Sequence, residues 1–358
     1  MSITRLNLQD FLQLAATNLV LDVRSPGEYA QAHIPNAISL PLFSDEERKI
    51  VGTAYKQESR QKAIKQGLKY FGSSMVGMVE TVEAIFNLQK PKIAEEFSKV
   101  VLVHCWRGGM RSAAVAWLLD LYGFKVYTLI GGYKAYRHWV LKHFENDYNI
   151  KIIGGYTGSG KTPLLHQLQK NGEKIIDLEG LANHKGSAFG GLGVDPQPTQ
   201  EMFENLLATA LSKVENENEI IWIENESQRI GNLNIPTPFF NTLRKKALLF
   251  LNIPFEERLN HIVNDYGKFS NELLINAILR IKKRLGGLDT KNAINFLLED
   301  NVEGCFRILL NYYDRGYWKS TSSRTNGEQL ITTVDAATIN EKENAKKIIE
   351  HARGNEQH

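Results

Sequence analysis

Short apolar runs alternate with amphipathic segments along most of the chain. Apolar runs bounded by turn-forming residues predict buried strands, and a 3.6-residue spacing of apolar positions predicts the helices between them. In the first 145 residues, strands are expected at 19–23, 100–104 and 126–130. Further along, they are expected at 151–154, 174–177, 219–224, 247–253 and 329–334. This alternation indicates parallel sheets covered by helices on both faces.

The pattern changes twice along the sequence. It restarts after Asn146 and Asp147, and beyond Pro254 it becomes mostly helical. The sequence therefore predicts an α/β protein with two domains. A parallel-sheet domain is expected over residues 1–146, and a second α/β domain with a helical C-terminal part over residues 147–358.

Composition narrows the class of protein. Hydrophobic residues make up 42% and charged residues 23% of the chain, which is typical of globular proteins. No apolar run reaches the roughly 20 residues that a membrane span needs, and the N-terminus lacks the pattern of a secretory signal. We therefore expect a cytoplasmic protein that does not bind membranes. The two cysteines, Cys105 and Cys305, are too far apart in sequence to indicate a disulfide framework or a structural zinc site.

A cysteine directly follows the expected strand at 100–104. Open α/β sheets bind ligands at the carboxyl ends of their strands, and the N-terminus of the next helix favours a thiolate. Arg107 and Arg111 add positive charge, so we expect Cys105 and these two arginines to be catalytic. Residues 105–111 are called the thiol loop, and its remaining members are Trp106, Gly108, Gly109 and Met110. Such a loop is suited to negatively charged sulfur or selenium, or to an oxyanion beside it.

The first domain resembles the rhodanese superfamily over most of residues 1–145. The resemblance rests on Asp22, Val23 and Arg24, on the segment 33–37, and on Cys105, which matches the persulfide-carrying cysteine of the family. The Cys-x5-Arg spacing is one residue longer than in the usual sulfurtransferase loop. It is similar to the loop of the dual-specificity phosphatases that share the fold, so a phosphatase-like activity is the alternative for this domain.

A glycine-rich loop follows the expected strand at 151–154 and fits the pattern G-x-x-x-x-G-K-[ST] at every required position. Its glycines bring backbone N–H groups to phosphate oxygens, Lys161 neutralises charge, and the Thr162 hydroxyl is suited to hold Mg²⁺. This phosphate loop comprises Gly155, Tyr156, Thr157, Gly158, Ser159, Gly160, Lys161 and Thr162. A nucleoside triphosphate and the diphosphate of another donor both fit it.

Three carboxylates are candidates for the metal side of this loop. Asp177 and Glu224 each end an expected strand, and Glu226 follows closely. The pattern does not choose among them, and each also fits a surface carboxylate at a strand end.

The whole chain resembles the bacterial tRNA 2-selenouridine synthase family. Besides the two loops, the resemblance rests on the segments 177–187 and 224–231 and on Tyr312, Tyr313 and Asp314. The chain departs from the expected pattern at Lys185, where arginine is expected, and at Asn225, where aspartate is expected.

This resemblance implies a transferase that converts 2-thiouridine to 2-selenouridine at the wobble position of tRNA. It implies two co-substrates: geranyl diphosphate, which prenylates the sulfur, and selenophosphate, which supplies the selenium. The phosphate loop suits the diphosphate of a prenyl donor, and the longer thiol loop suits selenophosphate. Alkylation allows the sulfur to leave as a thiolate, so that selenium can replace it. This sequence of steps explains why one chain would contain both sites.

A net charge of +3 does not by itself indicate a nucleic-acid partner, but basic residues cluster at 60–69, 244–246 and 280–284. A tRNA anticodon loop is gripped mainly through its phosphates, so the family resemblance favours Arg280, Lys282, Lys283 and Arg284 as tRNA contacts over a merely solvated helix face. Candidates for lining a prenyl or base pocket are the aromatic residues Trp106, Trp222, Tyr317 and Trp318.

Two other functions fit parts of the pattern. The chain could be a nucleotide-dependent kinase or ATPase fused to a Cys-x5-Arg phosphatase-like domain. It could also be a tRNA-binding module without catalysis, but the intact consensus positions of both loops disfavour that interpretation.

Overall fold

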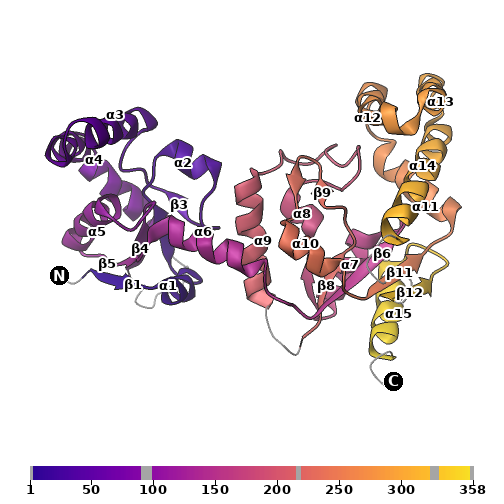
Figure 1. Ribbon diagram of the computed structural model, residues 1–358, viewed down its shortest axis with the longest axis horizontal. Coiled ribbons are helices and arrows are strands. Elements are labelled where there is room, and N and C mark those ends of the chain that lie inside the picture. The colour runs from indigo at the N-terminus through magenta and orange to yellow at the C-terminus, as the bar shows by residue number, and fades with distance from the viewer. Residues whose placement is uncertain (1–2, 90–98, 215–218, 323–329, 355–358) are drawn as a thin grey trace. The chain divides into compact units, whose positions relative to one another are not determined.

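The computed structural model describes residues 3–89, 99–214, 219–322 and 330–354, with the side chains of 318–322 left out. The chain divides into two compact units, Met1–Lys142 and His143–His358, and each unit is built on its own parallel sheet (Figure 1). The division falls at the end of helix α6 (Gly132–His143), close to the boundary expected at residue 147. We call the two parts the N-terminal unit and the C-terminal unit.

The sheet of the N-terminal unit has the strand order β1-β5-β4-β2-β3, and all its strand pairs are parallel. The strands are β1 (Thr4–Leu6), β2 (Leu19–Asp22), β3 (Ile38–Ser39), β4 (Val100–His104) and β5 (Lys125–Leu129). Every residue of β2 and β4 is buried, as expected for parallel strands covered on both faces. The central strand β4 ends directly before Cys105.

The helices of this unit are α1 (Leu8–Ala15), α2 (Pro26–Gln31), α3 (Asp45–Gln57), α4 (Arg60–Gln89), α5 (Met110–Tyr122) and α6. Helices α3 and α4 pack against each other as a helical hairpin between β3 and β4. The N-terminus of α3 is fixed by a capping box of Ser44 and Glu47, and α4 packs Phe71, Met78 and Val82 into the core of the unit. The sequence pattern did not indicate this hairpin.

The sheet of the C-terminal unit has the order β12-β11-β6-β8-β7 and is also parallel throughout. Its strands are β6 (Ile150–Gly155), β7 (Lys174–Ile176), β8 (Ile221–Glu224), β11 (Leu248–Asn252) and β12 (Ile331–Asp335). A short antiparallel pair, β9 (Arg229–Ile230) and β10 (Leu233–Asn234), follows β8. The central strand β6 runs directly into the phosphate loop.

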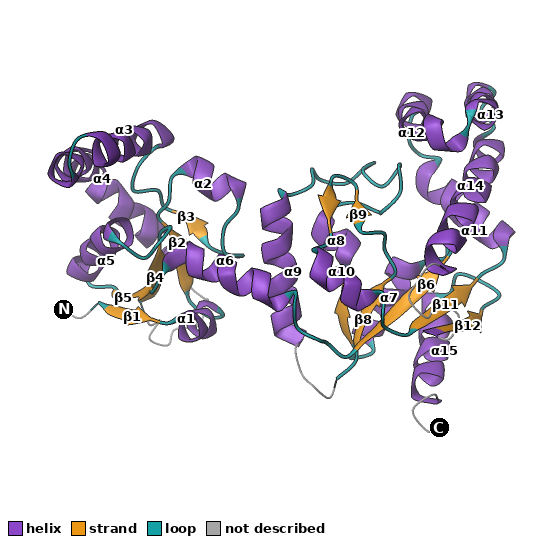
Figure 2. Cartoon of the chain, in the orientation of Figure 1, coloured by secondary structure: helices purple, strands orange, loops and turns teal. Residues whose placement is uncertain are grey.

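The helices of the C-terminal unit fall into two sets. Helices of the first set alternate with the strands: α7 (Lys161–Lys170), α8 (Leu178–Ala182), α9 (Gln200–Val214), α10 (Thr237–Leu243) and α15 (Glu341–Gly354). The second set lies at the right of Figure 2 and comprises α11 (Phe255–Tyr266), α12 (Asn271–Leu285), α13 (Gly287–Leu298) and α14 (Val302–Ser322). This helical group has a hydrophobic core of its own, which includes Leu259, Ile278 and Leu309.

The predicted α/β class is confirmed, with two parallel-sheet domains and a helical part in the C-terminal half. The sequence did not predict β1 and β3, because these strands are only three and two residues long. Within the described residues, no helix combines the length and the apolar character that crossing a membrane requires.

Candidate functional site

Strand β4 delivers Cys105 to the carboxyl edge of the N-terminal sheet, where the thiol is buried. The turn that follows β5 packs on the thiol loop, because Tyr133 N donates to Cys105 O at 2.8 Å. A Cβ at Gly132, which has a φ of +59°, would lie 2.3 Å from that carbonyl oxygen. The loop can therefore sit against this turn only when the residue is glycine.

Hydrogen bonds favour the thiolate form of Cys105. Burial alone would raise the pKa of its thiol, but hydrogen bonds from Ser112 and from the backbone of Ser112, Gly109 and Arg107 outweigh burial and lower the pKa. The Ser112 hydroxyl lies 3.3 Å from the Cys105 sulfur. Cys105 thus has the environment of a reactive cysteine, whereas burial raises the pKa of Cys305 to about 12.

The two arginines of the thiol loop have different surroundings. Arg111 is held by Glu28, with Nη1 at 2.7 Å from Oε2. Burial would raise the pKa of Glu28, but Arg111 and its other partners lower it to about 2, so this ion pair persists at neutral pH. Arg107 is exposed, as are Trp106 and Met110. The largest causes of the lowered Cys105 pKa are therefore hydrogen bonds, and not the arginine charges that the sequence indicated.

Two upstream residues of the rhodanese pattern, Asp22 and Arg24, form a buried salt bridge. Arg24 is buried and forms a salt bridge with the buried Asp22, with Nε at 2.9 Å from Oδ1. Its guanidinium also lies over the Tyr133 ring, 3.8 Å from the centroid. This network ties the end of β2 to the start of α6, the same two regions that flank Cys105.

Replacing Ser112 with alanine should raise the pKa of Cys105, because it removes a hydrogen bond that the thiolate accepts. The rate of alkylation by iodoacetamide, followed against pH by mass spectrometry of the Cys105 peptide, should then have its midpoint at higher pH than in the wild type. A Cys305→Ala background serves as the control, since the Cys305 thiol stays protonated in this range. An unchanged midpoint would mean that Ser112 does not stabilise the thiolate.

In the C-terminal unit, the phosphate loop joins β6 to α7 at the carboxyl edge of the sheet. Gly160 has a φ of +72° and precedes Lys161, the first residue of α7. Burial alone would lower the pKa of Lys161, but Tyr317 and the carboxylates of Glu226, Glu179 and Glu224 raise it. Lys161 is therefore a partly buried cation at the N-terminus of a helix, which is the arrangement that binds phosphate.

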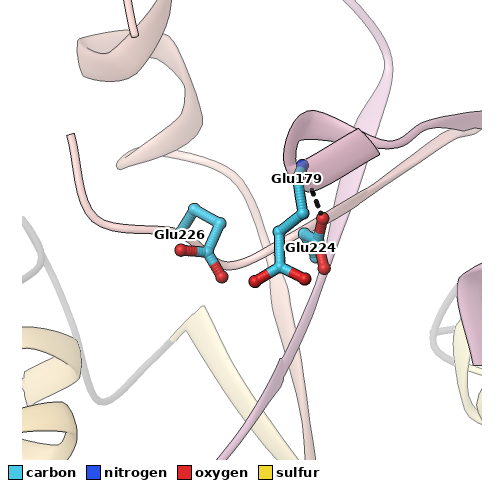
Figure 3. A group of neighbouring side chains, drawn as sticks. All are labelled: Glu179, Glu224 and Glu226. Atoms are coloured by element: carbon cyan, nitrogen blue, oxygen red, sulfur yellow. Dashed lines mark hydrogen bonds between the residues drawn. The ribbon is translucent and has the colours of Figure 1, made fainter. Parts of the chain in front are cut away.

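Three glutamates converge near one another, as Figure 3 shows: Glu179 from α8, Glu224 from the end of β8 and Glu226 from the loop after it. Their nearest carboxylate oxygens all lie within 4.8 Å of one another. The Thr162 hydroxyl donates to this cluster, at 2.9 Å from Glu179 and 3.2 Å from Glu224. Burial and then mutual repulsion raise the pKa of Glu226 to about 8. A cluster of this kind is suited to a divalent cation next to bound phosphates.

Of the carboxylates that the sequence indicated, Glu224 and Glu226 belong to this cluster and Asp177 does not. Asp177 caps α8 by accepting from Gly180 N at 2.7 Å, and its other oxygen lies 2.8 Å from His166 Nε2. Glu179 takes its place in the cluster. Sequence reasoning missed Glu179, although its position at the start of a helix just after β7 is a signal that could have found it.

A cavity of about 1050 Å³ opens from the phosphate loop. Its lining includes the loop from Thr157 to Thr162 together with Glu179 and Glu226. It also includes apolar and aromatic side chains from the helical group and the segment before α9. These are Phe189, Ile262, Tyr266, Phe306, Leu309, Leu310, Tyr312 and Tyr313. Charged side chains line the cavity as well, among them Lys185, Asp265 and Arg284. The cavity therefore offers both charged and apolar surface to a ligand that carries a phosphate group.

Two of the aromatic candidates are placed differently with respect to this cavity. Tyr317 lines it, and its hydroxyl accepts from Gly155 N at 3.1 Å and from Asn225 Nδ2 at 2.8 Å. Trp222 does not, because it is buried in the core beside the sheet. The side chain of Trp318 lies outside the described residues.

Arg258 fastens the helical group to the phosphate loop. It is buried, forms a bidentate salt bridge with Asp314 at 2.9 and 2.8 Å, and donates to Thr157 O at 3.1 Å. This contact gives a structural reason for the aspartate that follows Tyr312 and Tyr313 in the sequence.

The basic residues of α12 occupy its C-terminal half. Arg280, Lys282, Lys283 and Arg284 are all exposed. Arg284 also lines the cavity, and Arg280 lies close enough to His184 to contribute to the lowered pKa of that residue, of which burial is the main cause. The basic end of α12 therefore reaches the cavity through Arg284.

The fold and the two sites define a two-domain transferase. Its first domain is rhodanese-like and carries the activated thiol, and its second is a P-loop domain with a carboxylate cluster and a cavity. The model of the rhodanese-like domain matches residues 7–138, and that of the tRNA 2-selenouridine synthase AAA domain matches residues 148–347. The chain belongs to the tRNA 2-selenouridine synthase family.

The sequences of curated relatives with that name align with most of this chain. The relative from Nitrosomonas europaea is 38% identical, over 71% of this chain and 65% of its own length. The relative from Hydrogenovibrio crunogenus is 37% identical, over 78% of this chain and 79% of its own. The relative from Psychromonas ingrahamii is 32% identical, over 88% of this chain and 91% of its own.

Proposed function

We propose that this chain is a tRNA 2-selenouridine synthase that works in two steps. In the first step, the sulfur of 2-thiouridine at the wobble position of tRNA attacks C1 of geranyl diphosphate. A C–S bond forms, the C–O bond to diphosphate breaks, and the base loses its N3 proton. In the second step, the selenium of selenophosphate attacks C2 of the base, so that a C–Se bond forms, the C–S bond breaks and geranylthiol leaves with a proton. Water then attacks phosphorus, the P–Se bond breaks, and phosphate is released from 2-selenouridine. Family membership and the presence of both sites support this proposal.

The observation that carries the first step is the composition of the cavity at the phosphate loop. The phosphate loop and Lys161 offer donors and positive charge to a diphosphate, and Phe306, Leu309 and Leu310 add apolar surface to the lining. Burying a ten-carbon chain against such surface is favourable by about 0.8 kcal/mol per CH₂. The cavity lining thus supports a prenyl diphosphate as the ligand.

The carboxylate cluster and the neighbouring Thr162 hydroxyl fit a magnesium ion. Its ligands would come from Thr162, Glu179, Glu224 and Glu226. Bound there, Mg²⁺ would offset the charge that develops on the departing diphosphate. Lys161 and the backbone N–H groups of the phosphate loop would orient and bind the same group.

For the second step, the Cys105 thiolate and the surrounding backbone N–H groups are the proposed selenium site. The loop is long enough to surround a tetrahedral phosphate-like group such as selenophosphate. The exposed Arg107 adds positive charge for such an anion, whereas the charge of Arg111 is already paired with Glu28. The Cys105 environment, which lowers the pKa of the thiol, supports a role as a nucleophile that handles selenium.

The direct test is mass spectrometry of the nucleosides of 2-thiouridine tRNA after incubation of the protein with geranyl diphosphate and selenophosphate. We expect S-geranyl-2-thiouridine with the first co-substrate alone and 2-selenouridine with both. Unmodified tRNA in both reactions, together with hydrolysis of an aryl phosphate, would instead support the kinase or ATPase with a phosphatase-like domain.

The exposed cations of α12 are the proposed tRNA contacts beside the cavity. Replacing Lys282, Lys283 and Arg284 with alanine should weaken tRNA binding. It should also make the negative slope of log affinity against log salt shallower by about 2, since each lost phosphate contact reduces counterion release. Fluorescence anisotropy of labelled tRNA at several salt concentrations measures this slope. An unchanged slope would mean that these residues of α12 do not contact the phosphates of tRNA.

A further inference from the structure

The helical hairpin of the N-terminal unit, α3 and α4, carries a basic surface that the two proposed reaction sites do not use. We propose that this surface is a second docking site for tRNA, which contacts the phosphates of the RNA backbone. The inference rests on the proposed function, because it takes tRNA as the partner. It is independent of the α12 cluster, which belongs to the other unit.

Three lysines of α4 lie on one face of the helix. Lys62, Lys65 and Lys69 follow each other at intervals of three and four residues, and all three are exposed. Ala63, Gly67 and Phe71, spaced by four residues, are buried on the opposite face. Packing of α4 against the rest of the unit therefore turns the lysines toward solvent.

Positive charge is concentrated at this end of the hairpin. Between residues 56 and 69 there are five cations and one carboxylate, Glu58. Glu58 and Lys62 form an ion pair of 2.9 Å in which both side chains are well exposed, so the pair contributes little energy. Lys65 and Lys69 have no salt-bridge partner within the part of the chain that the structure describes. The members of the cluster are Lys56, Arg60, Lys62, Lys65 and Lys69.

Helix stability does not explain this distribution of charge. The first turn of α4 contains Arg60 and Lys62 but no acidic residue, although the positive end of a helix dipole favours acids and disfavours cations. The first turn of α3, in contrast, contains three acidic residues, as the dipole favours. The cations of α4 are thus placed at a small energetic cost, which an anionic partner would offset.

Apolar side chains among the cations favour RNA over a simple anion. Tyr55 is 52% exposed and precedes Lys56, and Leu68 is 61% exposed and precedes Lys69. A single-stranded or looped RNA offers phosphates to the lysines and unstacked bases to an aromatic ring. A tRNA has both features.

The test compares two triple variants of the full-length protein that lose the same charge. Lys62→Ala/Lys65→Ala/Lys69→Ala removes the outward face of α4, and Lys170→Ala/Lys342→Ala/Lys346→Ala removes three exposed lysines of α7 and α15. We expect the α4 variant to bind labelled tRNA at least about tenfold more weakly at low salt, with a salt slope lower by about 2 to 3, and the control variant to bind as the wild type does. A third variant with arginine at the three α4 positions should retain affinity.

Equal weakening in both alanine variants would overturn the inference, because it would show an effect of net charge and not of a docking surface. Wild-type affinity and slope in the α4 variant would also overturn it. Alanine is a good helix former and these positions are exposed, so both variants should keep the circular dichroism of the wild type. If wild-type protein fails to bind tRNA at all, the proposed function fails instead, and the two failures are thereby distinguished.

Discussion

Replacing Cys105 with alanine is expected to abolish formation of 2-selenouridine while S-geranyl tRNA accumulates. The substitution deletes the thiol at the end of β4 but leaves the phosphate loop and its carboxylate cluster intact, since they belong to the other unit. Geranylation of 2-thiouridine should therefore continue, and the product should go no further. Mass spectrometry of tRNA nucleosides after reaction with both co-substrates measures the two products together.

The matched control is Cys305→Ala, which removes the other thiol from the core of the helical group and should retain both steps. Supplying tRNA that is already geranylated gives the sharper comparison, because only the second step is then required. Selenation of this tRNA by Cys105→Ala at the wild-type rate would mean that the thiol loop is not the selenium site.

Replacing Lys161 with alanine should reduce geranylation on the order of a hundredfold or more, because the charge that stabilises the departing diphosphate is lost. The loss should be severe at this position, since Lys161 is also the cation among three buried or partly buried glutamates. Without it, the repulsion among Glu179, Glu224 and Glu226 is no longer offset. Selenation of plain 2-thiouridine tRNA should fall with geranylation, because it needs the prenylated intermediate.

Lys170→Ala is the control for this variant, since Lys170 ends the same helix at an exposed position and should be dispensable. With pre-geranylated tRNA, Lys161→Ala should regain at least part of its selenation activity, whereas Cys105→Ala should have none. Geranylation by Lys161→Ala at the wild-type rate would mean that Lys161 of the phosphate loop does not stabilise the departing diphosphate.

The two loops and the two-domain fold were predictable from sequence because their signals are local. A cysteine or a glycine-rich run next to a strand and before a helix is defined within about ten residues, and the sheet places both at its carboxyl edge. The carboxylate cluster was predicted only in part. Glu224 directly ends a strand, but Glu179 joins it through folding of a segment 45 residues away.

Other features depend on contacts that no local pattern contains. The salt bridge of Arg258 with Asp314 joins residues 56 positions apart, and the lowered pKa of Cys105 arises from Ser112 and the loop backbone and not from the nearby arginines. The helical hairpin was missed for a different reason. Its long helix has glycines and polar residues spread among its apolar positions, which weakens the periodic signal.

Arg258 also determines how short a working fragment of the C-terminal unit can be. A fragment that ended after β11 and α11 would contain every residue of the phosphate loop and the whole carboxylate cluster, but it would lack Asp314. Arg258 would then lose the carboxylate that pairs with its guanidinium beside the phosphate loop. The helices beyond α11 therefore help to hold Arg258 against the loop, and a fragment without them would lack this support.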